Sequence, residues 1–441
     1  MTELVRIPVE RLNLPPRTGP LRRMAKHPRL MHHHRLLSAV IVTNLAVGVH
    51  GAAEGWFHTQ DAALAATSWA VLVNLALAVL IRQQYVVNLL FWLATRAPTH
   101  WPLRVRWTLG KVYHFGGLHV GAAIAGTLWF GVHAGCLTGA VLAGADQVQV
   151  ARAAVTYALV VLLVSMVWTA LPAKRAARHD RFEYVHRYGG WTVLGLFWAQ
   201  TVLAARAGAP GSGSAQLLVL AVITFSVALP WLRLRRVRID AVRPSSHVVV
   251  AGFDHGVTPF AGSSTAISRN PLRQWHGFAN VPTPGRSGFR LVISRAGDWT
   301  GTFVDDRPER VWVKGIPTAG VANIEVLFTK VVYVATGSGV GPCLPHLIAR
   351  AVPCHLVWAT RSPRATYGDA LVDEILAVQP DATIWDTTVD GKPDMLRLAY
   401  QAYRDTGAEA VICISNKRLT WDVVYGLEQR GIPAYGAIWD S

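Results

Sequence analysis

The sequence predicts a six-helix transmembrane bundle followed by an antiparallel β-barrel and an α/β doubly wound domain. Three patterns indicate this fold: six long apolar stretches in the first half, short β-branched runs after them, and regular strand–helix alternation toward the C-terminus. The chain has 441 residues, of which 51% are hydrophobic and 16% charged, which is too apolar for a wholly soluble protein. We expect a basic segment at 1–35, the bundle at 36–235, the barrel at 245–329 and the α/β domain at 330–441.

The positive charge is distributed as in a membrane protein. Lys and Arg number 43 against 26 Asp and Glu, for a formal charge of +17. The basic stretches are Arg17–Arg35, Arg96–Lys111, Lys174–Arg187 and Arg233–Arg243, and they separate the apolar segments. This pattern favours a lipid bilayer as partner and argues against nucleic acid. The positive-inside rule puts both termini in the cytosol of a multi-pass integral membrane protein, and the compact loops favour a bacterial inner membrane.

Six segments have about the length that a helix needs to cross a hydrocarbon core. They are Leu36–Ala53, Ala62–Ile81, Phe115–Ala143, Ala153–Leu171, Gly189–Ala205 and Leu217–Leu232. The first thirty residues lack the apolar core of a cleavable signal sequence, so we expect the first helix to direct insertion. Four cysteines without CxxC spacing suggest no disulfide framework, zinc site or iron–sulfur site.

The second half contains short strand candidates. Those expected in the barrel are His247–Gly252, Phe289–Ser294, Arg310–Lys314 and Asn323–Phe328. Strands then alternate with helices in four pairs: Val331–Ala335 with Pro345–Arg350, His355–Ala359 with Asp369–Ala377, Thr383–Trp385 with Met395–Thr406, and Ala410–Ile414 with Trp421–Arg430. Such alternation is typical of a doubly wound parallel sheet.

A glycine-rich turn follows the first of these parallel strands. Its residues are Thr336, Gly337, Ser338, Gly339, Val340, Gly341 and Pro342. Glycines let the backbone approach a pyrophosphate, and free amides at a helix start favour its negative charge. A plain tight turn is the alternative, but the strand before it and the helix after it are the context that a nucleotide site requires.

This turn resembles the pyridine-nucleotide turn of the ferredoxin reductase family, and three further stretches resemble the NADPH oxidases and ferric reductases. Arg273–Ala279 is similar to their flavin-binding strand, with Gly277 in place of proline and Ala279 in place of a hydroxyl residue. Ser294–Thr300 matches their Gly-Asp-Trp-Thr segment, and Lys314–Pro317 stands where they have a Gly-Pro turn. The resemblance implies a ferredoxin reductase-like module with FAD bound by Arg273, Trp275, His276, Gly277, Phe278, Ala279, Lys314 and Gly315.

The same resemblance implies further roles near the nucleotide. Trp439 corresponds to the C-terminal aromatic residue that covers the flavin at the catalytic position, although a packed terminal tryptophan is an alternative. Arg361 and Arg364 follow the second parallel strand and could meet a 2′-phosphate, which favours NADPH over NADH. The family's Cys-Gly-Pro is replaced by Cys413-Ile-Ser-Asn416, so nicotinamide positioning is less well defined than flavin binding.

Three histidines lie in or beside the predicted spans. His119 and His133 are 14 residues apart on one helix face, and His186 stands level with His119 at the inner end of the fifth helix. The resemblance implies haem b between His119 and His186, and His133 is a weaker ligand candidate because no histidine faces it. One inner haem, a second haem with an unusual ligand, and no haem all remain open, since imidazoles at a basic interface also serve as ordinary hydrogen-bonding groups.

Together these features predict a membrane flavoprotein oxidoreductase. It would pass electrons from NADPH or NADH through FAD, with one inner haem as an option, to a quinone-like or small-molecule acceptor at or within the membrane domain. The alternative is a flavin-binding sensor, scaffold or transporter that retains the reductase fold without full redox activity, because two family segments are altered.

Overall fold

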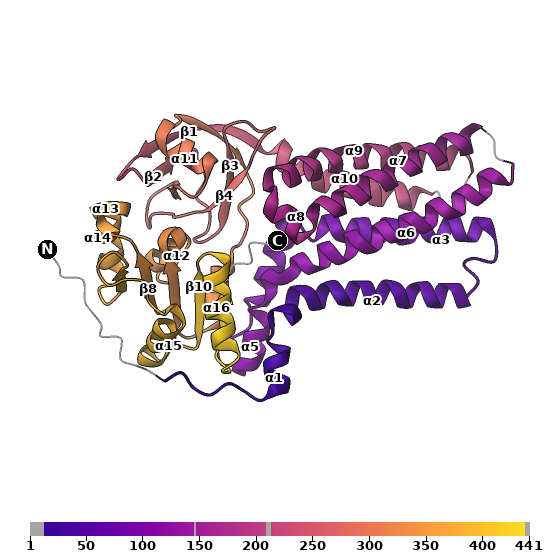
Figure 1. Cartoon of the computed structure of the whole chain (residues 1–441). Helices are drawn as coiled ribbons and strands as arrows, with labels where there is room; N and C mark the ends of the chain where they lie inside the picture. The colour runs from indigo at the N-terminus through magenta and orange to yellow at the C-terminus, as the bar shows by residue number, and fades with distance from the viewer. Residues whose placement is uncertain (1–12, 145–146, 209–212, 437–441) are drawn as a thin grey trace.

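The protein is described by a computed structural model over residues 13–144, 147–208 and 213–436. Long helices lie at one end, and two domains that contain β-sheets lie at the other (Figure 1). The chain builds the helical end first and then the two sheet domains.

The helical end begins with α1 (Pro20–Ala25), η1 (Pro28–Leu30), α2 (His32–Ala53) and α3 (Gln60–Leu80). The shorter α4 (Gln84–Ala94), α5 (Leu103–Leu109) and η2 (Val112–Phe115) follow, and then α6 (Gly116–Leu142) and α7 (Gln147–Ala170). The helical end is completed by α8 (Pro172–Ala177), α9 (His179–Arg206) and α10 (Ser214–Leu232). Helix α6 packs against α2, α3 and α7, and α7 packs against α9.

Among the described residues, five helices are long and apolar enough to span a membrane: α2, α3, η2 with α6, α7 and α10. The six-helix count is therefore not confirmed. The expected span Gly189–Ala205 forms part of α9. This helix begins with the highly charged stretch His179–Arg187 and carries Gln200 within its apolar part, which lowers its mean hydropathy.

The first sheet domain is a nearly closed antiparallel barrel. Its strands are β1 (Leu234–Val242), β2 (Val248–Phe253), β3 (Ser264–Ser268), β4 (His276–Ala279), β5 (Phe289–Ser294) and β6 (Arg310–Lys314), in the order β4-β3-β6-β1-β2-β5. A bridge between Val281 and Arg290 joins the two edges. The nine-residue helix α11 (Asp298–Asp306) connects β5 to β6.

Two expectations about the barrel change. Strand β1 begins at Leu234, within what the sequence suggested was a basic loop, and it pairs with both β2 and β6. Arg236, Arg238 and Asp240 are exposed and alternate with the buried Val237 and Ile239, so this part of the strand buries only its apolar face. The predicted strand Asn323–Phe328 is wrong, because this segment forms the 3-10 helix η3 (Val321–Leu327).

The second sheet domain confirms the doubly wound pattern. Its strands are β7 (Val331–Thr336), β8 (Cys354–Thr360), β9 (Thr383–Asp386), β10 (Ala410–Ile414) and β11 (Ala434–Gly436), in the parallel order β11-β10-β7-β8-β9. The helices are η4 (Gly337–Gly339), α12 (Val340–Ala349), α13 (Pro363–Tyr367), α14 (Asp369–Val378), α15 (Met395–Thr406) and α16 (Lys417–Glu428). The side chains of β7 and β10 are almost all buried, as expected for parallel strands covered on both faces.

Candidate functional site

The glycine-rich turn lies at the carboxyl edge of the parallel sheet, between β7 and α12. Gly337 has φ +50°, in the left-handed region that favours glycine. A Cβ on Gly339 would stand 2.0 Å from the carbonyl oxygen of Ile414 at the end of β10, so no larger residue fits there. Thr336 and Ser415 share a hydrogen bond between their hydroxyl groups. These contacts hold the backbone of the turn close to β10, with Ser338 exposed to solvent.

The turn also contacts the barrel. A Cβ on Gly341 would stand 3.6 Å from the carbonyl oxygen of Val292 on β5, and α12 packs against both β4 and β5. Pro342 continues the helix beside it and is half-buried. The candidate nucleotide turn and the candidate flavin strand therefore lie beside each other.

The candidate flavin strand β4 carries an aromatic stack. Trp299 lies in the first turn of α11. Its ring centroid is 4.1 Å from that of His276 and 6.3 Å from that of Phe278. On the same strand, Gly277 is exposed and Ala279 is half-buried. Strand β4 pairs with β3 at both positions. The Nε2 atom of His276 is buried and has no hydrogen-bond partner among the described residues. Such an atom fits a ligand that supplies the missing bond, so this face of the barrel suits a flavin.

Lys314 and Trp275 form the basic side of this region. The Lys314 ammonium lies 4.5 Å from the Trp275 ring and 4.9 Å from the Trp231 ring, and burial lowers the pKa of Lys314 to about 8. A cavity of about 340 Å³ opens beside Lys314 and Gly315, and Arg233 and His255 also line it. The three basic side chains that line this cavity, Arg233, Arg235 and Lys314, suit an anionic group.

Arg273, Arg361 and Arg364 are placed differently. Arg273 is exposed, and its carbonyl oxygen accepts a hydrogen bond from Arg187. Arg361 is exposed just after β8, on the same sheet edge as the glycine-rich turn. Arg364 is already paired with Asp369 and Asp373, at 3.0 and 2.7 Å. Of the two arginines expected near a 2′-phosphate, Arg361 is therefore the better placed. Trp439 lies outside the described residues.

The helical end brings His119 and His186 together. Their ring centroids are 6.0 Å apart, and Nδ1 of His119 is 2.7 Å from the carbonyl oxygen of Ala78. His133 pairs with Thr67 at 2.9 Å. The described residues contain no group of three or more His, Cys, Asp or Glu side chains that could hold a metal ion. Haem ligation by these histidines stays a prediction.

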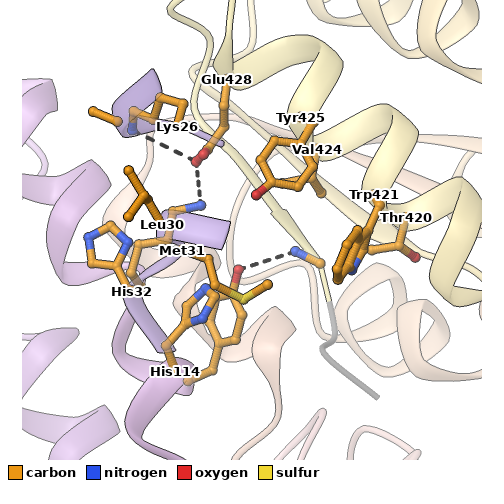
Figure 2. Close-up of a pocket in the computed structure, with 14 residues that line it drawn as sticks. Lys26, Leu30, Met31, His32, His114, Thr420, Trp421, Val424, Tyr425 and Glu428 are labelled. Atoms are coloured by element: carbon orange, nitrogen blue, oxygen red, sulfur yellow. Dashed lines mark hydrogen bonds and ion pairs between the residues drawn. The ribbon is translucent and has the colours of Figure 1, made fainter. Parts of the chain in front are cut away.

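Sequence reasoning missed an interface between the helical end and the α/β domain. The stretch Arg96–Lys111 was expected to be a cytosolic loop, yet the side chains of Arg106 and Lys111 are each only 5% exposed. Arg106 pairs with Glu409, and Lys111 pairs with Glu428 on α16 (Figure 2). The only hint in the sequence was that this basic chain has few acidic residues. Each acidic residue has many basic residues as possible partners, so the sequence does not identify the ion pairs.

The barrel, the parallel sheet behind it and the two adjacent candidate sites define a ferredoxin reductase-like module. Residues 321–441 match a family profile described as "Adenylate-forming reductase 03009, C-terminal domain". The chain is 40% identical over 431 residues to adenylate-forming reductase 03009 of Coprinopsis cinerea, and 40% identical over 432 residues to adenylate-forming reductase 06235 of the same organism. Each alignment covers 96% of this chain and 41% of the relative, so the chain spans less than half the length of these relatives.

Solved structures resemble the module at lower identity. A ferredoxin NADP+ reductase from Neisseria gonorrhoeae with bound FAD and NADP matches 46% of this chain and 98% of its own, with 13% identity and a TM-score of 0.38. The ferredoxin-NADP+ reductase from Plasmodium falciparum matches 47% of this chain and 96% of its own, with 11% identity and a TM-score of 0.38.

These relatives correct the function expected from the sequence. The matched profile and both relatives are adenylate-forming reductases, not the NADPH oxidases and ferric reductases that the motifs resembled. The expected electron path from FAD to an acceptor in the membrane is therefore wrong.

Proposed function

We propose that this chain performs an NAD(P)H-dependent reduction within an activity of the adenylate-forming reductase type. The similarity to two such reductases over 96% of the chain supports this class. The observation that carries the proposal is the contact between the glycine-rich turn and the barrel, where Gly341 lies against Val292 of β5. A nucleotide bound by the turn would meet a flavin bound at β4 across this contact.

The residues of the two sites have separate tasks. A flavin accepts a hydride from a reduced nicotinamide and can release electrons one at a time. The backbone of Gly337–Gly341 would hold the pyrophosphate of the nucleotide, and Arg361 would meet its 2′-phosphate. His276 would donate to or accept from the flavin through Nε2, while Lys314 would place a positive charge near it.

The relatives' name suggests a substrate class. Formation of an adenylate commonly activates a carboxyl group, whose carbonyl carbon is then bonded to the phosphate oxygen of AMP. Addition of a hydride to this carbon and cleavage of its bond to that oxygen give an aldehyde and AMP, so the step consumes two electrons. We propose such an activated acyl group as the substrate class of the reductive step.

Spectroscopy of the purified chain tests the proposal. A flavin absorption envelope that bleaches on anaerobic addition of NADPH is the expected result, followed by recovery when benzoyl adenylate is added and benzaldehyde appears. A chain that copurifies with no flavin, and that cannot be reconstituted with FAD, would refute the cofactor assignment. Flavin that NADPH leaves oxidised would refute the reductive role.

We also propose that the apolar helices anchor the chain in a lipid bilayer with both termini on the cytosolic side. Large apolar side chains of α2 point outward, and Val42, Leu45 and Val49 are 63%, 65% and 73% exposed. Contiguous exposed apolar surface of this kind is costly in water. Membranes washed with alkaline carbonate should retain the chain, and its release into the supernatant would overturn the anchoring.

A further inference from the structure

The segment that connects β3 to the candidate flavin strand β4 is bound by helix α9. The hydroxyl group of Tyr188 donates a hydrogen bond to the carbonyl oxygen of Leu272 at 2.6 Å. The guanidinium of Arg187 donates to the same oxygen at 3.3 Å and also to the carbonyl oxygen of Arg273. Two neighbouring side chains of α9 therefore hold the backbone just before His276.

The other hydrogen bonds of this segment are local. The amide of Leu272 donates to the side chain of Asn270 at 3.0 Å, and the indole of Trp275 donates to the carbonyl oxygen of Pro271 at 2.8 Å. Leu272 is itself 54% exposed, so apolar packing contributes little at this position. Among the described residues, the hydrogen bonds from α9 are thus the ones that tie residues 270–275 to another element.

Aromatic rings of the helical end also contact this segment. Trp275 meets Trp231, near the end of α10, edge-on at 6.2 Å between ring centroids. Trp231 in turn meets Trp191 of α9 edge-on at 5.0 Å. The ammonium group of Lys314 lies over the rings of both Trp275 and Trp231. The ring that precedes His276 is therefore packed from the side of the helices, in the geometry that aromatic pairs prefer.

Arg187 is itself held in place by its own helix. Its guanidinium lies 3.7 Å from the carboxylate of Glu183, one turn earlier, and the Arg187 side chain is only 15% exposed. The first turn of α9 acts on the flavin strand as well. Burial lowers the pKa of His276, while the charge of Asp180 raises it and that of His179 lowers it. Helix α9 therefore acts on His276 both through the preceding backbone and through charge.

We propose that Arg187 and Tyr188 are positioning residues for the flavin, and that the N-terminal half of α9 is part of the flavin site. This inference rests on the proposed flavin binding at β4. The two side chains fix the carbonyl groups just before the strand, and thereby set the direction in which Trp275 and His276 face the ligand. Such support matters because hydrogen bonds to a ligand weaken steeply when their distance or angle changes.

Titration of the flavin-free full chain with FAD tests the inference. Tyr188→Phe removes one donor, and Arg187→Met removes the other. The matched controls are Tyr184→Phe, because Tyr184 is 42% exposed one turn earlier, and Arg181→Met, because Arg181 is exposed on the same helix. We expect the unchanged chain and both controls to bind FAD equally well. The affinity should fall about threefold to tenfold in Tyr188→Phe and at least about tenfold in Arg187→Met, since hydrogen bonds from charged groups are the stronger ones.

The bound flavin supplies a second measurement. At saturating FAD, we expect the visible circular dichroism of the flavin to change in Tyr188→Phe and Arg187→Met. The thermal unfolding temperature of the flavin-free variants should stay that of the unchanged chain. The spectrum reports the surroundings of the bound isoalloxazine ring, so it separates a displaced flavin strand from a general loss of fold.

FAD affinities and flavin spectra that are equal in all these proteins would overturn the inference and leave flavin binding intact. The same conclusion would follow from equal losses of affinity in the two controls. It would also follow from a loss of affinity that comes with a lower unfolding temperature and an unchanged flavin spectrum. Failure of the unchanged chain to bind FAD would overturn both this inference and the proposed function.

Discussion

The guanidinium of Arg106 donates two parallel hydrogen bonds to the carboxylate of Glu409, at 2.7 and 3.0 Å. It also donates to the carbonyl oxygens of Leu327 and Trp101, at 2.9 and 2.8 Å. Glu409 in turn accepts the backbone amide of Thr329 at 2.8 Å. A bidentate pair of this geometry is among the stronger polar contacts in proteins, so it fixes the segment before the third apolar helix to the α/β domain.

This pair predicts a loss of stability in acid. The hydrogen bond from Arg106 lowers the pKa of Glu409 to about 2, from an ordinary value of 4.5. A carboxyl group with a lowered folded-state pKa stabilises the fold fully above its unfolded pKa and loses that contribution as the pH falls through the folded one. We expect the thermal unfolding temperature to fall between pH 4.5 and about 2, and to fall less steeply in Arg106→Met.

The matched control is Arg364→Met. Arg364 also pairs with carboxylates, but its partners Asp369 and Asp373 have side chains that are 77% and 62% exposed. Exposed pairs contribute little, so this variant should keep the acid profile of the unchanged chain. Identical acid profiles for Arg106→Met and the unchanged chain would show that the Glu409 pair does not link stability to pH.

Removal of Glu428 should destabilise the chain strongly. Glu428→Ala would leave the buried Lys111 ammonium without its counter-charge, which costs roughly 3–5 kcal/mol. The double variant Lys111→Met with Glu428→Ala should recover much of this loss, because no unpaired charge then remains. Denaturant unfolding of the three proteins measures the difference.

Glu374→Ala serves as the control for this prediction. Glu374 pairs with Arg290, and their side chains are 30% and 28% exposed. Its removal should cost less than about 1 kcal/mol. A Glu428→Ala variant no less stable than Glu374→Ala would contradict the buried-pair interpretation.

The glycine-rich turn provides a test with two neighbouring glycines. In Gly339→Ala the new Cβ would meet the Ile414 carbonyl oxygen at 2.0 Å, which forces the turn away from β10. A displacement near 1 Å can reduce turnover on the order of a hundredfold. In Gly341→Ala the nearest atom would be 3.6 Å away, an ordinary contact, so that variant should retain NADPH oxidation. Equal rates in both variants would mean that the turn does not position the nucleotide.

Local sequence patterns predicted much of the fold. Strands β5, β6 and β10 and helix α15 have the bounds that their apolar periodicity predicted. Strand β1 was missed because Arg235, Arg236 and Arg238 surround Val237 and make the segment resemble a basic loop. The segment after Gly320 folds as η3 because the Asn323 side chain accepts the Gly320 amide at 2.8 Å, a capping bond that the apolar run does not reveal.

The candidate sites and contacts also differ in whether the sequence could predict them. The glycine-rich turn and the β4 strand could be found from motifs, because each is continuous in sequence. The Arg106–Glu409 pair joins residues 303 positions apart, and no local pattern indicates which acid meets which base. The Lys111–Glu428 pair likewise joins distant segments, so it emerges only when the α/β domain is placed against the helical end.

Arg361 should determine the choice between NADPH and NADH. It is exposed directly after β8, where a 2′-phosphate would lie if the glycine-rich turn holds the pyrophosphate. A hydrogen bond to a charged group contributes about 1.5–3 kcal/mol, so Arg361→Ala should raise the KM for NADPH roughly tenfold to a hundredfold and leave the KM for NADH unchanged. Arg364→Ala, whose guanidinium is held by Asp369 and Asp373, should change neither. Equal increases in the KM for NADPH and for NADH would show that Arg361 does not contact the 2′-phosphate. An effect of Arg364→Ala alone would assign the NADPH specificity to Arg364.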